Sequence, residues 1–271
     1  RVNSPSDKMG GNGKIVKPRK LHGSSWGYLC PAETPEGQPV GLVKNLALTA
    51  KITSSSNSAM VRNIISNMNI KLIEDCKPLE ICNSCSIFIN GDWIGITNEP
   101  EKVVKLLRSE RRQANINIYT GIYWNFSQRY IRVYTDAGRL VRPLYIVDIE
   151  NEANKLRINN NFIQEFKKAD YSFNFLISPK FYNSIESVAS IKPEMETGIY
   201  LETQRDILSK FGLEGVIEYI DTNEVNNTYQ AVHLKDLKKF KMPYINNHTH
   251  CEIHPGLILG AVASVIPFSD D

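Results

Sequence analysis

The stretch HTHCEIHP, from His248 to Pro255, gathers side chains that bind metals or transfer protons. Zinc is bound by imidazole, thiolate and carboxylate groups, so a metal hydrolase centred on His250, Cys251 and His254 is one hypothesis. The zincin pattern is not matched, because it requires a helical His-Glu-x-x-His, and Pro255 would end such a helix. The alternative is that these side chains form a buried hydrogen-bond network beside the apolar run that follows.

Two carboxylates, Glu33 and Glu36, lie in the stretch WGYLCPAETPEGQPVGL. Pro35 disfavours a helical conformation at the residue before it, and in an extended chain three steps separate the two side chains by roughly 10 Å. A retaining glycosidase needs about 5 Å between its carboxylates. Thr34-Pro35-Glu36-Gly37 fits a type I turn, with proline second and glycine fourth. The pattern therefore predicts a rigid loop that presents Glu36 to a cation or to another chain, and no catalytic pair.

Two shorter patterns do not complete a site. The sequence CNSC, Cys82–Cys85, has no second ligand pair at zinc spacing, and GGNG, Gly10–Gly13, matches neither the Walker nor the dinucleotide fingerprint. We interpret the first as two thiols that flank a hairpin and the second as part of a mobile loop.

The positive charge of the chain is concentrated at its beginning. The net charge is +3, but the first 30 residues hold six basic residues against Asp7, while the remaining residues hold 26 basic and 28 acidic ones. Such asymmetry predicts contact with a polyanion, and the alternative is a solvated tail.

Composition indicates a globular chain with room for about two domains: of 271 residues, 42% are apolar and 23% charged. Five cysteines, an odd number in a chain of this size, favour a reducing compartment over secretion. The apolar run Leu257 to Phe268 is too short to span a bilayer, so no membrane association is expected. Because the chain begins at Arg and stops just after this run, we expect a fragment.

Several elements can be predicted from residue patterns. The apolar spacing from Met60 to Met68 is that of one helix face, and Asn90-Gly91 between two β-rich runs predicts a hairpin. A helix is expected after Asn98, with an apolar face at Val103, Val104, Leu106 and Leu107 and with Arg108, Arg111 and Arg112 at its end, where these arginines either face solvent or contact nucleic acid. Strands are expected within 41–53 and 215–221, and a helix at Thr197–Phe211.

A second hairpin is expected in YIRVYTDAGRLVRPLYIV, with its turn at Asp136-Ala137-Gly138. Pro143 cannot donate a ladder hydrogen bond, so its strand should lie at a sheet edge or contain a bulge. The patterns together predict an α+β fold of mixed sheet and helix in several lobes.

Four segments carry a resemblance to a known family. KPRKLHGSSWGYLCPAETPEGQPVGLVKNLAL, DAGRLVRPL, IEYID and THCEIHPGLILGAVASVIPF resemble, in order and spacing, the second-largest subunit of multisubunit DNA-directed RNA polymerases. Trp26, Ala32 and GLVKNL are more similar to the eukaryotic, archaeal and large-DNA-virus branch than to the bacterial one. The resemblance implies a nuclear location, or a viral replication compartment or virion.

The resemblance also implies roles for residues. The basic loop from Asp7 to Lys17 looks like the element that lies over downstream DNA, which assigns nucleic-acid contacts to Lys8, Lys14, Lys17, Arg19 and Lys20. Glu36, with Arg19, would face the active-centre cleft and touch a mobile loop of the largest subunit. No catalytic residue and no metal ligand is expected in this fragment, since Mg²⁺ would be held by the largest subunit.

The expected partners are the largest and other polymerase subunits, template DNA, nascent RNA and nucleoside triphosphates. An alternative function is a stand-alone module that binds single-stranded nucleic acid. The resemblance implies a fork region at 1–50, external lobes at 51–150 and 151–212, a return to the fork at 213–247 and the start of the hybrid-binding region at 248–271.

Overall fold

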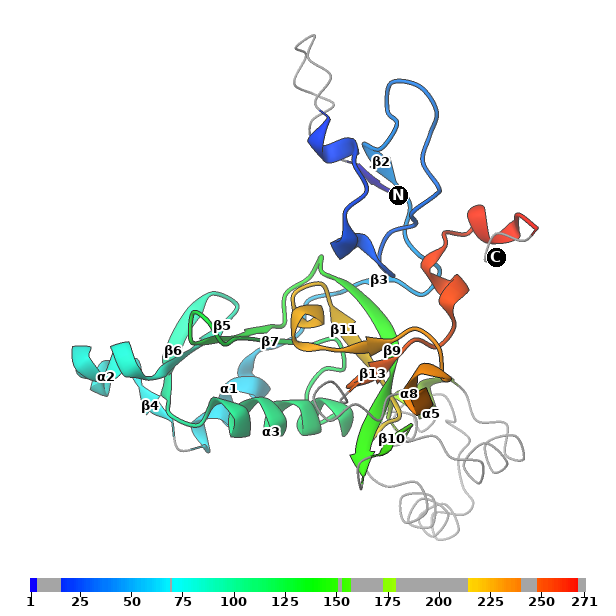
Figure 1. The fold of residues 1–271 in the computed structure, drawn as a ribbon. Coiled ribbons are helices and arrows are strands. Elements are labelled where there is room, and N and C mark those ends of the chain that lie inside the picture. Colours follow the sequence, from blue (N-terminus) through cyan, green and yellow to red (C-terminus); the bar gives the residue numbers. More distant parts are fainter. Residues whose placement is uncertain are drawn as a thin grey trace, which may run out of the picture.

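A computed structural model describes residues 1–3, 16–68, 70–150, 153–156, 173–178, 214–239 and 248–267. It confirms the α+β class: two mixed sheets lie next to each other, and an arm of mostly irregular chain rises from them (Figure 1). The helix expected at Thr197–Phe211 and most of 151–212 lie outside the described residues. Among the described residues, no helix is long and apolar enough to cross a membrane.

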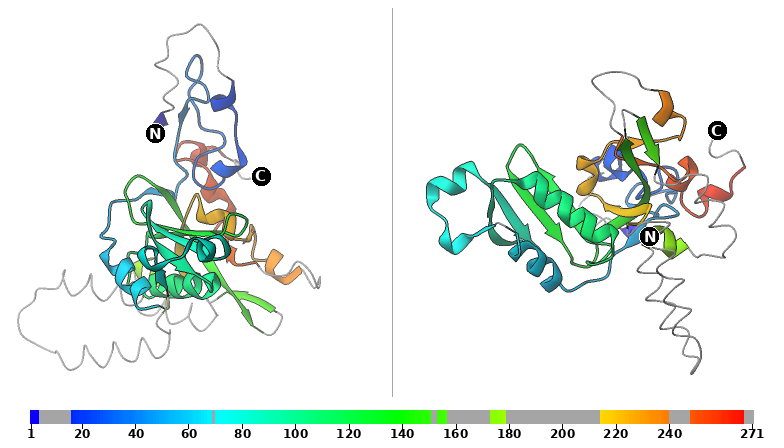
Figure 2. Two further views of the ribbon diagram at one scale, coloured as in Figure 1. Left: turned by 90° about the vertical axis from the view of Figure 1, so that its left-hand side faces the viewer. Right: turned by 90° about the horizontal axis from the view of Figure 1, so that it is seen from below.

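The first sheet has five strands in the order β4-β6-β5-β8-β7. Helices α1 (Ala59–Ser66) and α3 (Pro100–Arg112) pack on one of its faces (Figure 2), and buried side chains such as Val61, Ile65 and Leu107 meet those of the central strands. This burial agrees with the apolar spacing in both helices. The strands are β4 (Lys71–Leu72), β6 (Asp92–Thr97), β5 (Cys85–Ile89), β8 (Tyr130–Tyr134) and β7 (Gly121–Asn125).

The hairpin predicted at Asn90-Gly91 is confirmed. Asn90 and Gly91 have φ angles of 50° and 93°, the left-handed region that a tight hairpin turn requires, and β5 and β6 pair antiparallel on either side. The thiols of the CNSC pattern differ in their surroundings: Cys82 is exposed on helix α2 (Pro78–Asn83), and Cys85 is buried in β5.

Helix α3 begins at Pro100, one residue later than a cap at Asn98 would give. Glu99 occupies the N-cap position and Pro100 the first helical turn, while Asn98 instead accepts a hydrogen bond from the Ser84 hydroxyl. Leu106 is 37% exposed and so lies at the border of the apolar face. The expectation for the arginines at the end of the helix was wrong for Arg111, which is 2% exposed and faces neither solvent nor nucleic acid.

The second sheet is organised by β9 (Leu140–Glu150), which pairs with strands from distant parts of the chain. The strand predicted within 215–221 is confirmed as β11 (Ile217–Asp221), which pairs with β9 antiparallel. Only short strands form within 41–53. The remaining strands of this sheet are β3 (Lys51–Ile52), β10 (Ala153–Leu156), β12 (Gln230–Ala231) and β13 (His250–Cys251).

The second predicted hairpin was wrong, because β8 and β9 belong to different sheets. The edge assignment of Pro143 was wrong too, since β9 has neighbours on both sides. On one side β3 reaches Leu140 and Val141 and β13 reaches Tyr145 and Ile146. Backbone N–H groups point alternately to the two sides of a strand, so the nitrogen of Pro143 faces the gap between β3 and β13. On that side no described strand pairs with β9 at this point, and the N–H that proline lacks is therefore not needed for a ladder hydrogen bond.

The arm joins the two ends of the chain. Strand β1 (Val2–Asn3) pairs with β2 (Val43–Lys44), and the 3₁₀ turns η2 (Lys17–Arg19) and η3 (Gly23–Ser25) lie between them in sequence. The C-terminal turns η6 (Pro255–Ile258) and η7 (Ala263–Val265) run beside the arm (Figure 1), where Leu48 N donates to Leu259 O. Short helices α5 (Phe173–Ile177) and α8 (Asp236–Lys239) and the turns η4 (Ile73–Asp75) and η5 (Glu224–Asn227) complete the described elements.

Candidate nucleic-acid interface

The described residues on both sides of the basic loop lie near the Glu36 loop in the arm. Pairing of Val2 and Asn3 with Lys44 and Val43 fixes the chain before residue 4, and η2 fixes it after residue 15. The described residues that flank 4–15 on either side therefore lie beside the loop that contains Glu36. Lys17 and Lys20 are exposed on η2 and just after it, whereas Lys8 and Lys14 lie outside the described residues.

Arg19 connects η2 to this loop. Its Nη1 donates to Gln38 O at 2.5 Å and to Val40 O at 2.9 Å. Gly41 has φ 73°, and a Cβ there would lie 2.4 Å from Arg19 O, so glycine is required by both conformation and space. Arg19 thus uses part of its guanidinium to hold the loop in place, a structural role that the sequence did not suggest.

Glu33 and Glu36 have separate surroundings, which confirms that they form no pair on one helix face. Glu36 is exposed, while Glu33 Oε2 accepts from Val262 N at 3.3 Å and so contacts the C-terminal segment. Thr34 Oγ1 donates to Val43 O and accepts from Gly41 N, which closes the base of the loop. A hydrogen-bonded turn lies at Gly37–Val40, one turn beyond the predicted position.

A buried ion pair attaches the arm to the second sheet. Arg142 Nη1 lies 2.7 and 2.8 Å from the two oxygens of Glu252, and Trp26 Nε1 donates to Glu252 Oε1 at 3.3 Å. The Arg142 guanidinium also lies over the Tyr28 ring, and the Tyr28 hydroxyl donates to Ile220 O. These contacts join residues from all four of the sequence motifs, and they attach the base of the arm to the second sheet.

A second buried network joins α3, β11, η5 and β13. Arg111 Nη2 lies 2.9 Å from Glu218 Oε2, and Arg112 Nη2 lies 2.7 Å from Glu218 Oε1. His250 Nε2 is 2.6 Å from Glu218 Oε1. Burial would raise the pKa of Glu218, but the positive charges of Arg112 and Arg111 outweigh it and hold this pKa well below its usual range.

The metal-hydrolase hypothesis for His250, Cys251 and His254 is contradicted. His250 contacts Glu218, Cys251 is buried with its pKa raised to about 11 by desolvation, and His254 Nδ1 accepts from Gly256 N. Within the described ranges, no three His, Cys, Asp or Glu side chains are grouped as a metal site requires. The alternative, a buried hydrogen-bond network, is confirmed for His250 and Glu252, whereas His254 is exposed.

The cluster of Arg111, Glu218 and Glu224 was not predicted from the sequence. One signal was present: Arg111 follows Val104 and Leu107 at helical spacing, so it falls on the apolar face of its helix. A charged residue at such a position requires a buried partner. Its carboxylate partners lie more than 100 residues away in sequence, which no local pattern indicates.

The sequence of the chain matches models of a known protein family. Models of RNA polymerase Rpb2 domains 3, 4 and 5 match residues 1–52, 87–148 and 208–255, in that order. These are consecutive domains of one polymerase subunit. The chain belongs to the family of second-largest subunits of DNA-directed RNA polymerases, as the resemblance of its motifs implied.

Relatives align along the whole chain. It is 38% identical over 279 residues to DNA-directed RNA polymerase II subunit 2 of Arabidopsis thaliana and 33% identical over 295 residues to subunit RPB2 of Schizosaccharomyces pombe, covering 100% of this chain in both. DNA-directed RNA polymerase subunit 2 of Acanthamoeba polyphaga mimivirus is 32% identical over 95% of this chain. The chain spans 20%, 22% and 20% of these relatives, about a fifth of their length.

Proposed function

We propose that this chain is the part of an RNA polymerase that holds downstream DNA and braces the active-centre cleft during template-dependent RNA synthesis. The observation that carries the proposal is that the described residues on either side of 4–15, the strand Val2–Asn3 and Arg19, lie beside the loop of the exposed Glu36. Lysines at 8, 14, 17 and 20 would neutralise DNA phosphates without reading sequence, as a moving enzyme requires.

In this proposal the chain itself performs no chemistry. Nucleotide addition takes place at Mg²⁺ ions held by the largest subunit, which polarise the phosphoryl group and activate the attacking hydroxyl. Glu36 faces the cleft and contacts a mobile loop of that subunit. Arg19 holds the Glu36 loop in position through its hydrogen bonds to Gln38 O and Val40 O. The partners are the other polymerase subunits, DNA, RNA and nucleoside triphosphates, in the nucleus or in a viral replication compartment or virion.

The test uses polymerase assembled with the full-length subunit. Replacing Lys17 and Lys20 with Gln should reduce the salt dependence of DNA binding by close to two phosphate contacts, a slope change of roughly 1.8 in log K against log salt. Glu36→Ala should slow elongation several-fold and leave DNA affinity unchanged, because its side chain is not aimed at phosphates. The control replaces Lys102 and Lys105 with Gln, the same loss of charge on the exposed side of α3.

Two outcomes would contradict the proposal. If the Lys17 and Lys20 variant has the same salt-dependence slope as the α3 control, these lysines do not contact DNA phosphates. A normal elongation rate in the Glu36→Ala polymerase would show that the Glu36 loop does not act in the active-centre cleft.

A further inference from the structure

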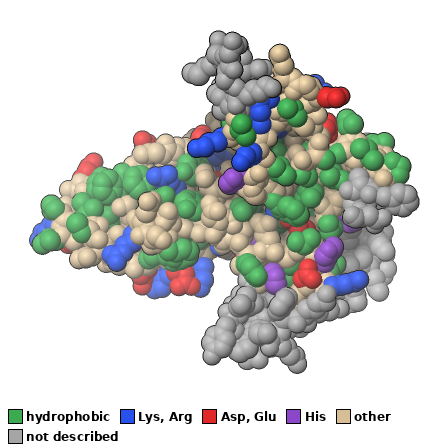
Figure 3. Space-filling model, turned by 45° about the horizontal axis from the view of Figure 1, so that its top comes forward, with side chains coloured by type: hydrophobic (Ala, Val, Ile, Leu, Met, Phe, Trp, Pro, Cys, Tyr) green, Lys and Arg blue, Asp and Glu red, His purple; other side chains and the backbone are tan. Residues whose placement is uncertain are grey.

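One face of the five-stranded sheet carries no helix in the described part of the chain. Helices α1 and α3 lie on the opposite face (Figure 2). On the uncovered face, hydrophobic side chains gather among a few basic ones (Figure 3). Alternation along β5, β7 and β8 assigns Phe88, Tyr123, Tyr130, Tyr134 and the cation Arg132 to it, and Trp93 of β6 lies alongside. We define the aromatic face by Phe88, Trp93, Tyr123, Tyr130 and Arg132.

The rings of this face form a continuous layer. The Phe88 ring stacks on Trp93 at 5.7 Å between centroids and meets the edge of Tyr130 at 6.4 Å. Tyr130 also meets Tyr123 edge-on at 6.0 Å. Trp93 is 38% exposed and the other rings are half-buried, so each ring is held by its neighbours while part of it remains open to solvent. The layer is ordered before any partner arrives, which lowers the entropy cost of binding.

The charge of the aromatic face is positive. Arg132 is exposed, and its guanidinium lies 4.4 Å from the centroid of the Tyr130 ring. Asp92, at the end of the β5–β6 hairpin, is 2.6 Å from Arg62 and is therefore already paired. Along β5, β7 and β8, which the structure describes in full, no acidic side chain balances Arg132 on this face. A ligand that supplies a carboxylate would match it.

The composition favours a protein as the occupant. Tyrosine, tryptophan, phenylalanine and arginine are the residues enriched at the centres of protein interfaces, whereas lysine and the acidic residues are depleted there. Nucleic acid would need several cations for its phosphates, and it would need ring faces free for stacking. A second copy of the chain related by a twofold axis would bring Arg132 close to another Arg132, which disfavours self-association.

We propose that the aromatic face docks a segment of a partner protein that places apolar or proline side chains on the rings and a carboxylate at Arg132. The proposal uses no residue of the candidate nucleic-acid interface. It therefore stands independently of the proposed function.

The test is site-specific photocrosslinking in the purified polymerase that contains the full-length subunit. Ser86, a half-buried neighbour of Phe88 on the same face, is replaced by p-benzoyl-phenylalanine, and crosslinked peptides are mapped by mass spectrometry. We expect one crosslinked segment from a partner protein, with an acidic residue beside apolar or proline residues. Arg132→Glu should lower the crosslink yield more than about tenfold, and an acid-to-arginine change in the mapped segment should restore it. Lys105→Glu, the same charge reversal on exposed α3, should leave the yield unchanged.

Four results would overturn the proposal: a crosslink to RNA or DNA, a crosslink to another part of the same subunit, a yield insensitive to Arg132→Glu, or no crosslink from this position. Assembly and primer extension by each variant are measured in parallel. If the Arg132→Glu variant fails to assemble, it is replaced by Arg132→Gln, which removes the positive charge and keeps a polar side chain.

Discussion

Arg111 and Glu224 form a bidentate pair inside the protein, although they are 113 residues apart in sequence. Arg111 Nη1 lies 2.6 Å from Glu224 Oε2, and Nη2 lies 2.8 Å from Oε1. Neither residue is more than 2% exposed. The pair holds the end of α3 against η5, and through Glu218 it extends to β11 and β13, so it connects the two sheets.

Removing one member of this cluster should destabilise the protein strongly. Arg111→Met leaves buried Glu224 without its bidentate partner and removes one of the two arginines that face Glu218, and we expect the free energy of unfolding to fall by about 3–5 kcal/mol. Denaturant titration followed by tryptophan fluorescence measures the change. Lys105→Met, on the exposed side of the same helix, should change it by less than about 0.5 kcal/mol. Equal effects of the two substitutions would show that the buried cluster adds nothing to stability.

The cluster should also make stability depend on acid pH. The folded pKa of Glu218 lies well below its ordinary value, because Arg112 and Arg111 outweigh the desolvation that would raise it. The ionised carboxylate therefore stabilises the fold fully above the unfolded pKa of about 4.3, and this contribution is lost as the pH falls below that value. Unfolding free energies measured from pH 7 to pH 3 should decline less steeply in Glu218→Gln. An unchanged slope would be evidence against the depressed pKa.

Glycine at position 41 should be indispensable to the arm. Gly41→Ala forces an L-residue to φ 73° and places Cβ against Arg19 O, so we expect a loss of at least about 1 kcal/mol and faster hydrogen exchange across 17–44. Gly23→Ala is the matched control, because nothing lies within 4 Å of its Cβ. If the two variants exchange alike, the close approach of Arg19 and Gly41 is not a constraint.

Cysteine reactivity should separate buried from exposed thiols. Desolvation raises the pKa of Cys251 to about 11, so at pH 8 only about one in a thousand of these thiols is ionised to the reactive thiolate. The side chain is buried as well. We expect iodoacetamide to modify exposed Cys82 first and to leave Cys251 intact in the folded chain. Peptide mass spectrometry gives the order, and all five cysteines should react in denaturant. Modification of Cys251 as fast as Cys82 would contradict its burial.

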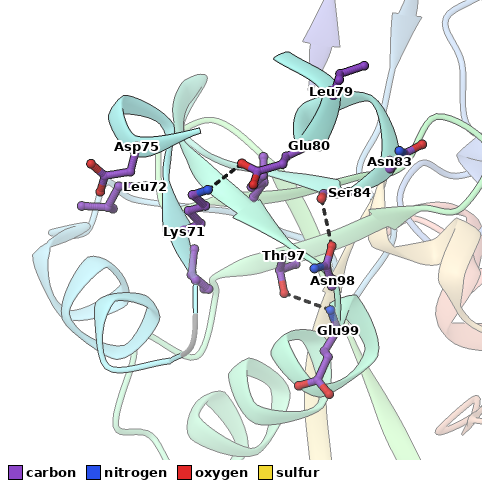
Figure 4. A pocket seen from close by; sticks show the side chains of 12 residues that line it. Lys71, Leu72, Asp75, Leu79, Glu80, Asn83, Ser84, Thr97, Asn98 and Glu99 are labelled. Atoms are coloured by element: carbon purple, nitrogen blue, oxygen red, sulfur yellow. Dashed lines mark hydrogen bonds and ion pairs between the residues drawn. The ribbon is translucent and has the colours of Figure 1, made fainter. Parts of the chain in front are cut away.

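A large groove lies at the end of the first sheet. It encloses about 1010 Å³ between β4, α2 and the end of β6 (Figure 4). Four of its polar side chains pair with one another, Lys71 with Glu80 and Ser84 with Asn98. The groove lies apart from the arm, and no comparison assigns it a role.

Local patterns were sufficient where neighbours in sequence decide the structure. Asn90-Gly91 predicted a tight turn because its preference for positive φ is a property of two adjacent residues, and the apolar spacing of 60–68 and 103–107 predicted the faces that α1 and α3 bury. Pro143 was misjudged because the harm a proline does to a sheet depends on which strands lie beside it. Those strands come from residues 51–52, 217–221 and 250–251.

The sequence by itself determined the family, the separation of Glu33 from Glu36 and the concentration of positive charge at one end, since each depends on residue identity and short spacing. Tertiary structure decided that Glu252 pairs with Arg142, that His250 meets Glu218 and that Arg19 holds the loop of Glu36. The physical reason is that a buried charge is stable only beside a partner, and the partner is chosen by how distant segments pack.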